Sequence, residues 1–492
     1  MPASTRTKAA RLSPKSKQTP VVKSKKRTLE EDNDQHDDTH NGDTQPLKRT
    51  KPAPEVVHIT NGHSTKIKPR AKTPSASSVI NVSFPAFSLS TAGQVLAVGE
   101  NGMAQLGLKS AISQRQNPQP VPLPELVIQI ACGPLHSVCL TEKNQIFTFG
   151  CNDEHALGRV DNDDDDDDEA DQFGLVDMSG VMDVNQEKII QLVAGDSHTL
   201  VLSDAGKVYG WGTFRSSTTG VYGLVQKGVM AKSPVEIILP EKIVKLASGY
   251  DFVLFLSETG HVYSCGNGET GQLARLNRYA AEDGLRGGID RLIRPAPIIY
   301  NRIGIKAKNL LFDDIFTGSH HFFLKVHGHD WILGGGLNNF NQLGLPVDEP
   351  VYFPTFIPSL EGKKWTKFSG GLHHTLGLTA DGEVYAMGRH HEGQLGIDQL
   401  TTHLSQPTLI PNLSNIIDIS CGNHVSFVID RSGKVFSFGA GTSLQCGHGQ
   451  EDIKIPRMMS SKFMDIKMIT NIAVGAQHTL FLTHDNPNKD EN

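Results

Sequence analysis

Residues 371–396 read GLHHTLGLTADGEVYAMGRHHEGQLG, and this stretch recurs in altered form along most of the chain. The shared pattern is G-x-x-H-x-x-x-L-x-x-x-G-x-V-x-x-x-G, followed by a turn that often ends in G-Q-L-G. A unit repeated at intervals of 51 to 69 residues predicts a repeat architecture. The first half of the unit begins at Gly133, Gly195, Gly249, Gly318, Gly371, Gly422 and Gly475. The second half ends at Gly99, Gly150, Gly212, Gly266, Gly334, Gly388 and Gly439.

Each unit predicts a small antiparallel sheet. Residues 146–149, 208–211 and 435–438 are rich in β-branched and aromatic residues, which favour strands. Tripeptides such as Ala380-Asp381-Gly382 separate these runs and are typical of hairpin turns, because glycine tolerates a positive φ. One such sheet cannot bury both of its faces alone. Seven sheets packed radially do so, and the sequence therefore predicts an all-β, seven-bladed β-propeller.

The order of the half-units predicts how the ring closes. The chain enters with a second half alone, at residues 95–99, and leaves with a first half alone, at residues 475–480. Pairing of these N- and C-terminal half-repeats would complete one blade and remove free sheet edges. We expect the propeller to span residues 87–485, followed by a disordered C-terminus at 486–492.

The fourth position of the half-unit is a histidine in several copies, including His136, His198, His374 and His478. Recurrence favours a structural role, and we expect a buried imidazole that bonds neighbouring backbone. Histidine pairs and the acidic run at 163–168 lack the ligand spacing of zinc or calcium sites, so no metal is expected. The G-x-G-x-x-G match at 266–271 lies inside a repeat, which indicates a turn.

Residues 1–86 differ from the rest in charge. They carry 16 Lys and Arg against 8 Asp and Glu, a net charge of +8, whereas the rest of the chain has a net charge of −14. So polar a stretch predicts a disordered tail. Two basic clusters within it predict nuclear import and DNA contact, although a solvated linker with no target is the alternative. The cluster residues are Lys23, Lys25, Lys26, Arg27, Lys48, Arg49 and Lys51.

Composition and motifs narrow the class of protein further. The six cysteines form no C-x-x-C pair, which favours reduced structural thiols inside a cell. No apolar run approaches 18 residues, so no membrane contact is expected. G-x-S-x-G, P-loop and H-E-x-x-H motifs are missing, and we expect neither a cofactor nor bond-making or bond-breaking catalysis.

Residues that depart from the repeat are candidates for function. Asp196 and Asp251 stand where other copies carry different residues, and His373 precedes the repeat's own histidine. Equivalent positions of a repeat gather on one face of a ring, which makes such departures a candidate binding surface. Residues 214–221 replace the usual turn with a polar one that would project from this face.

The chain resembles the regulator of chromosome condensation family, the guanine nucleotide exchange factors for the small GTPase Ran. The resemblance spans residues 87 to about 483 in order. It is carried by FGCNDEHALGR (149–159), AGDSHT (194–199), WGTFR (211–215), CGNGETGQLAR (265–275), SGGLHHT (369–375) and VGAQHT (474–479).

The resemblance assigns roles to particular residues. It implies that Asp196, Asp251, His373 and His478 serve exchange, and that Arg275 and Arg286 contact the GTPase. His478 also occupies the repeat's own histidine position. A wedge that pushes at the GTPase's phosphate loop maps onto Phe214, Arg215, Ser216, Ser217, Thr218, Thr219, Gly220 and Val221. The family usually has Asp-Asn-Asn after the wedge arginine, whereas this chain has Ser216-Ser217-Thr218-Thr219.

The resemblance also implies a cellular role. It implies a nuclear, chromatin-associated factor that promotes GDP release from Ran, supporting the nucleocytoplasmic transport gradient and the assembly of the mitotic spindle and nuclear envelope. Its implied partners are Ran, importin, and nucleosomes, with histones and DNA bound through the tail and one propeller face. The alternative function is a non-catalytic chromatin-binding scaffold built on the same propeller.

Overall fold

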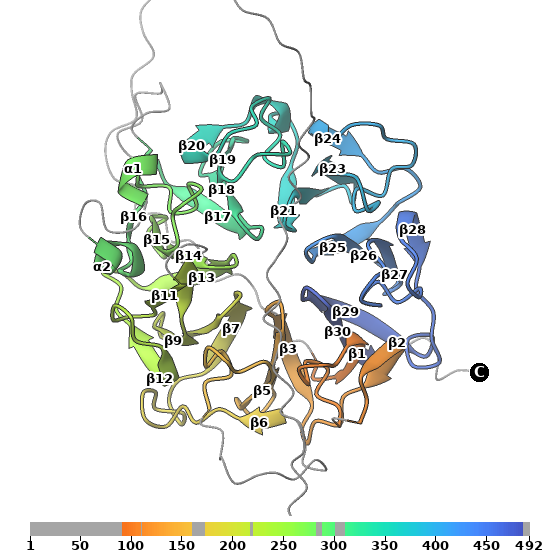
Figure 1. Cartoon of the computed structure of the whole chain (residues 1–492), viewed down its shortest axis with the longest axis horizontal. Coiled ribbons are helices and arrows are strands. Elements are labelled where there is room, and N and C mark those ends of the chain that lie inside the picture. Colours follow the sequence, from red (N-terminus) through yellow and green to blue (C-terminus); the bar gives the residue numbers. More distant parts are fainter. Residues whose placement is uncertain are drawn as a thin grey trace, which may run out of the picture. The chain divides into compact units, whose positions relative to one another are not determined.

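A computed structural model describes residues 91–109, 111–159, 173–216, 220–281, 288–300 and 310–485. Seven four-stranded antiparallel sheets stand around a central axis, as the repeat predicts (Figure 1). The basic tail, the acidic run at 163–168, the wedge tip at 217–219, Arg286 and residues 486–492 lie outside the described residues. The boundaries expected at residues 87 and 485 therefore stay predictions.

Six blades are continuous in sequence, and each begins at the innermost strand. Blade 1 holds β3 (Val127–Cys132), β4 (His136–Thr141), β5 (Ile146–Gly150) and β6 (Phe173–Leu175). Blade 2 holds β7 (Ile189–Ala194), β8 (His198–Ser203), β9 (Val208–Gly212) and β12 (Ala231–Ile237). Blade 3 holds β13 (Ile243–Ser248), β14 (Phe252–Ser257), β15 (Val262–Gly266) and β16 (Ala296–Pro297).

The next three blades repeat this order. Blade 4 holds β17 (Phe312–Thr317), β18 (His321–Val326), β19 (Ile332–Gly336) and β20 (Val351–Phe356). Blade 5 holds β21 (Trp365–Gly370), β22 (His374–Thr379), β23 (Val384–Gly388) and β24 (Leu404–Leu409). Blade 6 holds β25 (Ile416–Cys421), β26 (Val425–Asp430), β27 (Val435–Gly439) and β28 (Ile453–Met458).

Three short insertions interrupt the pattern. A two-stranded hairpin of β10 (Phe214–Ser216) and β11 (Gly220–Gly223) follows β9 in blade 2. Helices α1 (Arg278–Ala281) and α2 (Gly288–Ile293) precede β16, and the 3-10 turn η1 (Pro358–Leu360) follows β20. Among the described residues no helix is long and apolar enough to cross a membrane.

The seventh blade is built from both ends of the propeller chain. Its order is β2 (Gln114–Pro120), β1 (Gln94–Glu100), β30 (His478–Asp485) and β29 (Lys467–Val474). Strands β1 and β30 pair antiparallel, from Gln94 opposite Thr483 to Gly99 opposite His478. In Figure 1 the orange strands β1 and β2 accordingly lie beside the blue strands β29 and β30. The predicted closure is confirmed.

One predicted repeat position shifts in blade 4. The glycine that ends the third strand has a positive φ, as at Gly388, where φ is 105°. A Cβ on Gly388 would lie 2.4 Å from the carbonyl oxygen of His373, so only glycine fits there. In blade 4 Gly336 fills this place, with φ 101° and opposite His321, and the predicted Gly334 lies two residues earlier inside β19. Neighbouring glycines concealed the register in the sequence.

The recurring histidine joins neighbouring blades. In each of five blades its Nε2 lies within hydrogen-bond distance of a Ser or Thr hydroxyl of the next blade, rather than of backbone as expected. The pairs are His136–Thr199 at 3.0 Å, His198–Ser248 at 2.9 Å, His321–Thr375 at 2.7 Å, His374–Ser426 at 2.9 Å and His478–Ser137 at 2.8 Å. The last pair ties blade 7 to blade 1. Phe252 and Val425 stand at this position in the other two blades.

The hydroxyl partners decide how the imidazoles are protonated. Ser137 donates its proton to the carbonyl of Gln105, and Ser426 donates its proton to that of Gln394. The imidazole must then donate its Nε2–H to the hydroxyl. Burial lowers the pKa of His136 to about 4 and that of His478 to about 3. These side chains are neutral hydrogen-bond donors at physiological pH.

The glycine of G-x-x-H allows the histidine to take this place. The imidazole folds back over its own loop, and a Cβ added to Gly133 would lie 2.3 Å from His136 Cε1. The same Cβ would also lie 2.3 Å from the carbonyl oxygen of Gly195 in the next blade. Any side chain at this position would push the imidazole and the neighbouring blade away.

Apolar side chains fill the space between blades. Trp211 and Tyr209 of β9 are completely buried, and the Trp211 indole donates to the carbonyl of Ala156 at 2.7 Å. Phe427 of β26 and Phe481 of β30 form an edge-to-face pair in the facing blades 6 and 7. The core is therefore a ring of inter-blade layers.

Replacing Ser137 by Ala should destabilise ring closure, because His478 would keep a buried Nε2–H without an acceptor. We expect a loss of ~1–3 kcal/mol in the free energy of unfolding, measured by urea titration. Ser137→Thr is the matched control, since Thr199 and Thr375 fill the same role in other blades. Equal losses in the two variants would contradict the hydroxyl's role.

Acid should weaken the fold through these histidines. Their folded pKa values lie below the unfolded value of about 6.5, so the native state binds fewer protons and loses stability as the pH falls below 6.5. The expected loss is up to ~1.4 kcal/mol per pH unit for each histidine. Urea titrations between pH 7 and 5 measure it. His374→Phe, which copies Phe252, removes one such histidine. The slope of the free energy of unfolding against pH should therefore fall by up to ~1.4 kcal/mol per pH unit. An unchanged slope would contradict the assignment.

Candidate functional site

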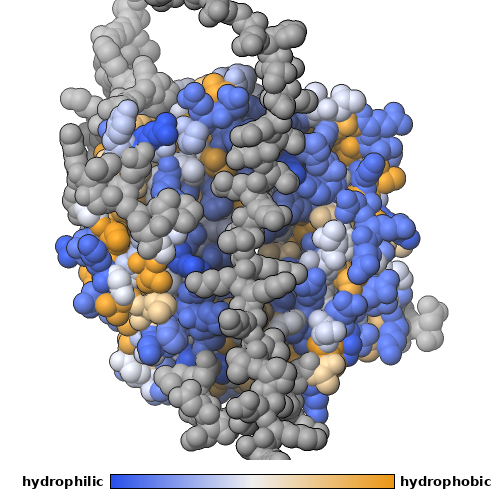
Figure 2. All heavy atoms as spheres, viewed as in Figure 1, coloured by the Kyte–Doolittle hydropathy of each residue, from blue (hydrophilic) through white to orange (hydrophobic). Residues whose placement is uncertain are grey.

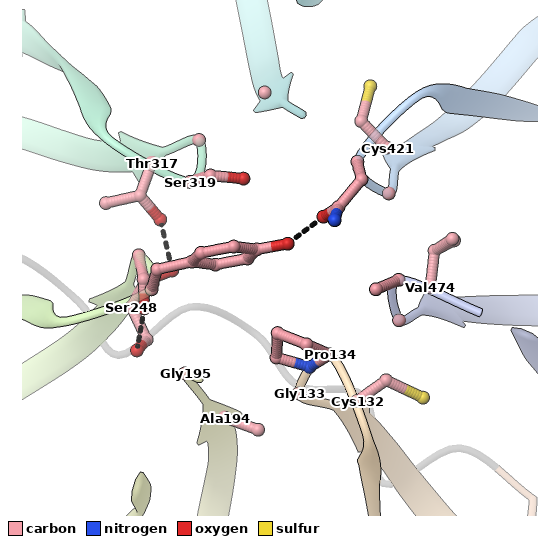
Figure 3. Close-up of a pocket in the computed structure, with 18 of the residues that line it drawn as sticks. Cys132, Gly133, Pro134, Ala194, Gly195, Ser248, Thr317, Ser319, Cys421 and Val474 are labelled. Carbon is pink, nitrogen blue, oxygen red and sulfur yellow. Dashed lines mark hydrogen bonds between the residues drawn. The ribbon is translucent and has the colours of Figure 1, made fainter. Parts of the chain in front are cut away.

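The loops between the first and second strands of the blades meet around the central channel. Their residues line a cavity of about 180 Å³ together with the ends of the innermost strands. Figure 3 shows Cys132, Ser248, Thr317, Cys421 and Val474, from five different blades, around this cavity. Equivalent repeat positions do gather at one end of the ring. The two residues between the glycine and the histidine of each loop, or between the glycine and the Phe252 or Val425 that replaces the histidine, form the candidate site.

Asp196 and Asp251 lie in the loops of the adjacent blades 2 and 3. Both side chains are half-buried. Burial raises the pKa of Asp196, although a hydrogen bond from Ser197 at 3.2 Å partly offsets this effect. Burial and then the charge of Asp196 raise the pKa of Asp251 to about 8. Because the charge of Asp196 acts on the Asp251 carboxyl, this part of the face favours a basic partner, whose charge would relieve the repulsion.

Asp251 also holds the base of the hairpin β10–β11. Its Oδ1 accepts a hydrogen bond from the backbone N–H of Arg215 at 2.9 Å, and Asn267 donates to the carbonyl of Arg215 at 3.0 Å. The Arg215 guanidinium pairs with Glu154 at 2.6 Å. Ser216 donates to Glu269 at 2.7 Å. Side chains of blades 1 and 3 therefore anchor the hairpin of blade 2.

Phe214 has a different place from the one that a projecting wedge implies. Its side chain is completely buried, with its ring centroid 4.7 Å from that of His198. Tyr222 of β11 is buried as well. Phe214 is thus an anchor of the wedge, whereas Arg215, Gly220 and Val221 are partly exposed. Ser217, Thr218 and Thr219, at the tip, lie outside the described residues.

His373 lies in the loop of blade 5 and is half-buried. Its ring packs against Phe340 with centroids 4.8 Å apart, and the Arg389 guanidinium lies 5.4 Å from the centre of the same phenyl ring. Burial, followed by the charge of Arg389, lowers the pKa of His373 to about 4. A neutral imidazole on this face is suited to hydrogen bonding rather than to ion pairing.

Two residues assigned by resemblance are interior. His478 has no exposed surface and donates its Nε2–H to the Ser137 hydroxyl. It therefore ties blade 7 to blade 1 and does not face a partner. Arg275 is 6% exposed, and its guanidinium donates to the carbonyls of Arg291, Leu292 and Arg294. Burial lowers its pKa to about 10. Arg275 thus fixes the segment around α2 from inside.

Sequence reasoning missed two neighbours of His373. His320 and His424 occupy the same loop position in blades 4 and 6, so three consecutive blades present an imidazole. Burial lowers the pKa of His320 to about 4, and burial also lowers that of His424. The triplets Gly318-Ser319-His320, Gly371-Leu372-His373 and Gly422-Asn423-His424 carry the signal at repeat spacing. The described residues contain no group of three His, Cys, Asp or Glu placed to hold a metal ion.

The face therefore has two halves with different chemistry. Blades 2 and 3 offer the carboxyls of Asp196 and Asp251 beside the anchored hairpin, and blades 4 to 6 offer the imidazoles. Figure 2 shows a mostly hydrophilic surface with apolar side chains gathered near α2 and β11. Val225 and Val229, in the turn after β11, are both more than 40% exposed. Charged, hydrogen-bonding and apolar groups together suit a protein partner.

Comparison with known proteins gives a consistent result. The family model described as the RCC1-like domain matches residues 94–481. The regulator of chromosome condensation of Homo sapiens is 37% identical over 397 residues, which cover 80% of this chain and 91% of that protein. The Saccharomyces cerevisiae protein named guanine nucleotide exchange factor SRM1 is 26% identical, over 78% of this chain and 85% of its own.

A solved structure agrees with the fold. The crystal structure of Prp20p from Saccharomyces cerevisiae, described with its binding properties to Gsp1p and histones, superposes with a TM-score of 0.71 at 25% identity. The match covers 81% of this chain and 93% of Prp20p. This chain thus belongs to the regulator of chromosome condensation family, and its propeller is an RCC1-like domain.

Proposed function

We propose that this chain is a guanine nucleotide exchange factor for a small GTPase of the Ran type. The observation that carries the proposal is the hairpin β10–β11, anchored by Asp251 beside Asp196 on the loop face of the ring. Membership of the family supports it, as do the relative named for exchange activity and the relative whose structure is described with Gsp1p binding.

Exchange requires no bond to be made or broken within the nucleotide. The factor must bind the nucleotide-free GTPase better than the loaded form, and by linkage the bound nucleotide then weakens the factor equally. The wedge tip at 217–219 displaces the GTPase's phosphate-binding loop. Asp251 positions the base of the wedge through its hydrogen bond with the backbone N–H of Arg215. Because the base of the hairpin is already held in place, little free energy of binding is lost in ordering it when the GTPase binds.

The remaining face residues divide into contact and support. Asp196 pairs with a basic group of the GTPase, and His373 donates a hydrogen bond from its neutral ring. His478 and Arg275 act from the interior by holding the closing blade and the α2 segment. Arg286 contacts the GTPase from the segment between α1 and α2.

We further propose that the protein works in the nucleus on chromatin. The basic tail binds importin and then DNA, and histones contact the tail and a propeller face, in line with the histone binding described for Prp20p. Exchange on chromatin would sustain the nucleocytoplasmic transport gradient and the assembly of the spindle and nuclear envelope.

Release of fluorescent GDP from purified Ran, with and without catalytic amounts of the protein, tests the activity. We expect acceleration both by the full chain and by residues 87–492. A well-folded protein that binds chromatin but leaves GDP release unchanged would be the non-catalytic scaffold instead.

Asp196→Asn should reduce exchange by about 30-fold or more, because loss of an interfacial charge whose partner stays buried costs ~2–5 kcal/mol. The fold should persist, since asparagine keeps an acceptor for Ser197. Asp381→Asn is the matched control, as Asp381 is exposed in the turn between β22 and β23, at the opposite ends of these strands. Wild-type exchange by folded Asp196→Asn protein would exclude the contact.

Replacing the seven basic cluster residues by alanine should weaken DNA binding without slowing exchange. If five of them neutralise phosphates, the plot of log K against log salt loses a slope of about 4.5. Titration of labelled duplex DNA at several salt concentrations measures this loss. The residues are Lys23, Lys25, Lys26, Arg27, Lys48, Arg49 and Lys51. An unchanged slope would exclude the tail as the DNA contact.

A further inference from the structure

Tyr250 has an unusual place in the ring of loops. It is the second residue of the blade 3 loop, and it is aromatic where the other six blades carry smaller or aliphatic residues. It lines the central cavity, which Figure 3 shows in close-up. Its counterparts are Pro134, Asp196, Ser319, Leu372, Asn423 and Ala476.

The Tyr250 side chain connects two blades that both line the central cavity. Its hydroxyl donates a hydrogen bond to Oδ1 of Asn423, which lies 173 residues later in the chain. Blades 3 and 6 are not neighbours, whereas the histidine–hydroxyl bonds join adjacent blades only. The bridge thus restrains the ring across its diameter rather than along its circumference.

Backbone hydrogen bonds connect the bridge to the candidate site. The N–H of Asp196 donates to the carbonyl of Tyr250 at 2.7 Å, and the N–H of Tyr250 donates to the carbonyl of Ser319 at 2.8 Å. On the other side, the N–H of Leu372 donates to the carbonyl of Asn423 at 3.1 Å. Leu372 and Asn423 each precede a histidine of the face, and Tyr250 precedes Asp251.

The environment keeps Tyr250 in its role as a donor. Its ring packs edge-on against His320, with centroids 5.3 Å apart. Burial, followed by the charge of Asp196, raises the pKa of Tyr250 far above its ordinary value. The hydroxyl therefore keeps its proton at physiological pH. Asn423, also half-buried, offers a neutral amide oxygen.

We propose that Tyr250 is a positioning residue for exchange. Its hydrogen bond to Asn423 locks the loop that carries Asp251 against the loops that carry His373 and His424, so that the GTPase meets a prearranged face. This inference rests on the proposed exchange function. Without the bridge the two halves of the face must be ordered when the partner binds, which weakens every complex with the GTPase equally.

Steady-state exchange by Tyr250→Phe protein tests the inference, since this change removes only the hydroxyl. Uniform weakening should raise KM for the GDP-loaded GTPase roughly 3–10-fold and leave kcat unchanged. A residue that only supports folding would instead lower the active fraction, and with it kcat. Tyr279→Phe is the control, because Tyr279 of α1 is 73% exposed.

The partner side of the bridge provides a second arm. Asn423→Leu should raise KM as Tyr250→Phe does, and the double variant should be no worse than either single one. Asn423→Asp keeps an acceptor oxygen and should restore a KM near that of the wild type. Unchanged KM in Tyr250→Phe, or additive losses in the double variant, would overturn the proposal.

Amide hydrogen exchange of the free protein separates this inference from the proposed function. The amides of residues 250–252 and 422–424 should exchange faster in Tyr250→Phe than in wild type, with no GTPase present. Unchanged protection would exclude the bridge whatever the activity. Faster amide exchange in a protein that never accelerates GDP release would retain the bridge but overturn the exchange function, and the positioning role with it.

Discussion

The hydrogen bond from a buried imidazole to a hydroxyl of the next blade is the interaction on which this structure depends. It occurs at five of the seven blade junctions. One of these is the junction between blades 7 and 1, where His478 bonds Ser137. It requires a glycine three residues earlier, because a Cβ at Gly371 would lie 2.4 Å from His374 Cε1. The G-x-x-H pattern is therefore the sequence form of one packing constraint.

That constraint leaves two residues of each loop free to vary. The glycine and the residue at the histidine position hold the ends of the loop, and the first of the two residues between them lines the central cavity in five of the seven loops. Carboxylates, imidazoles, two amides and a tyrosine all occur at these positions without disturbing the sheets. A rigid repeat thus separates stability from function: interior positions stay alike while the face changes from blade to blade.

The sequence was enough to predict the blades and their closure, because glycine and histidine spacing is local. It was also enough to place Asp196, Asp251 and His373 on one face. Its recurring histidine also predicted that His478 is buried, but the sequence could not show that Arg275 is interior, since that burial depends on how the residues around α2 fold over the side chain. Nor could it pair Tyr250 with Asn423, a contact between blades that are not adjacent. In blade 4, consecutive glycines concealed the register that places Gly336 opposite His321.

The closing blade has a topological consequence. Because β1 and β30 are hydrogen-bonded partners, the ends of the propeller chain lie side by side in one sheet, with Gln94 opposite Thr483. The fold has no intrinsic first blade, and a circular permutant could join these ends and open between any other two blades. The natural opening places both exits of the chain at a single blade. Segments attached at the two ends of the propeller chain therefore start from the same blade.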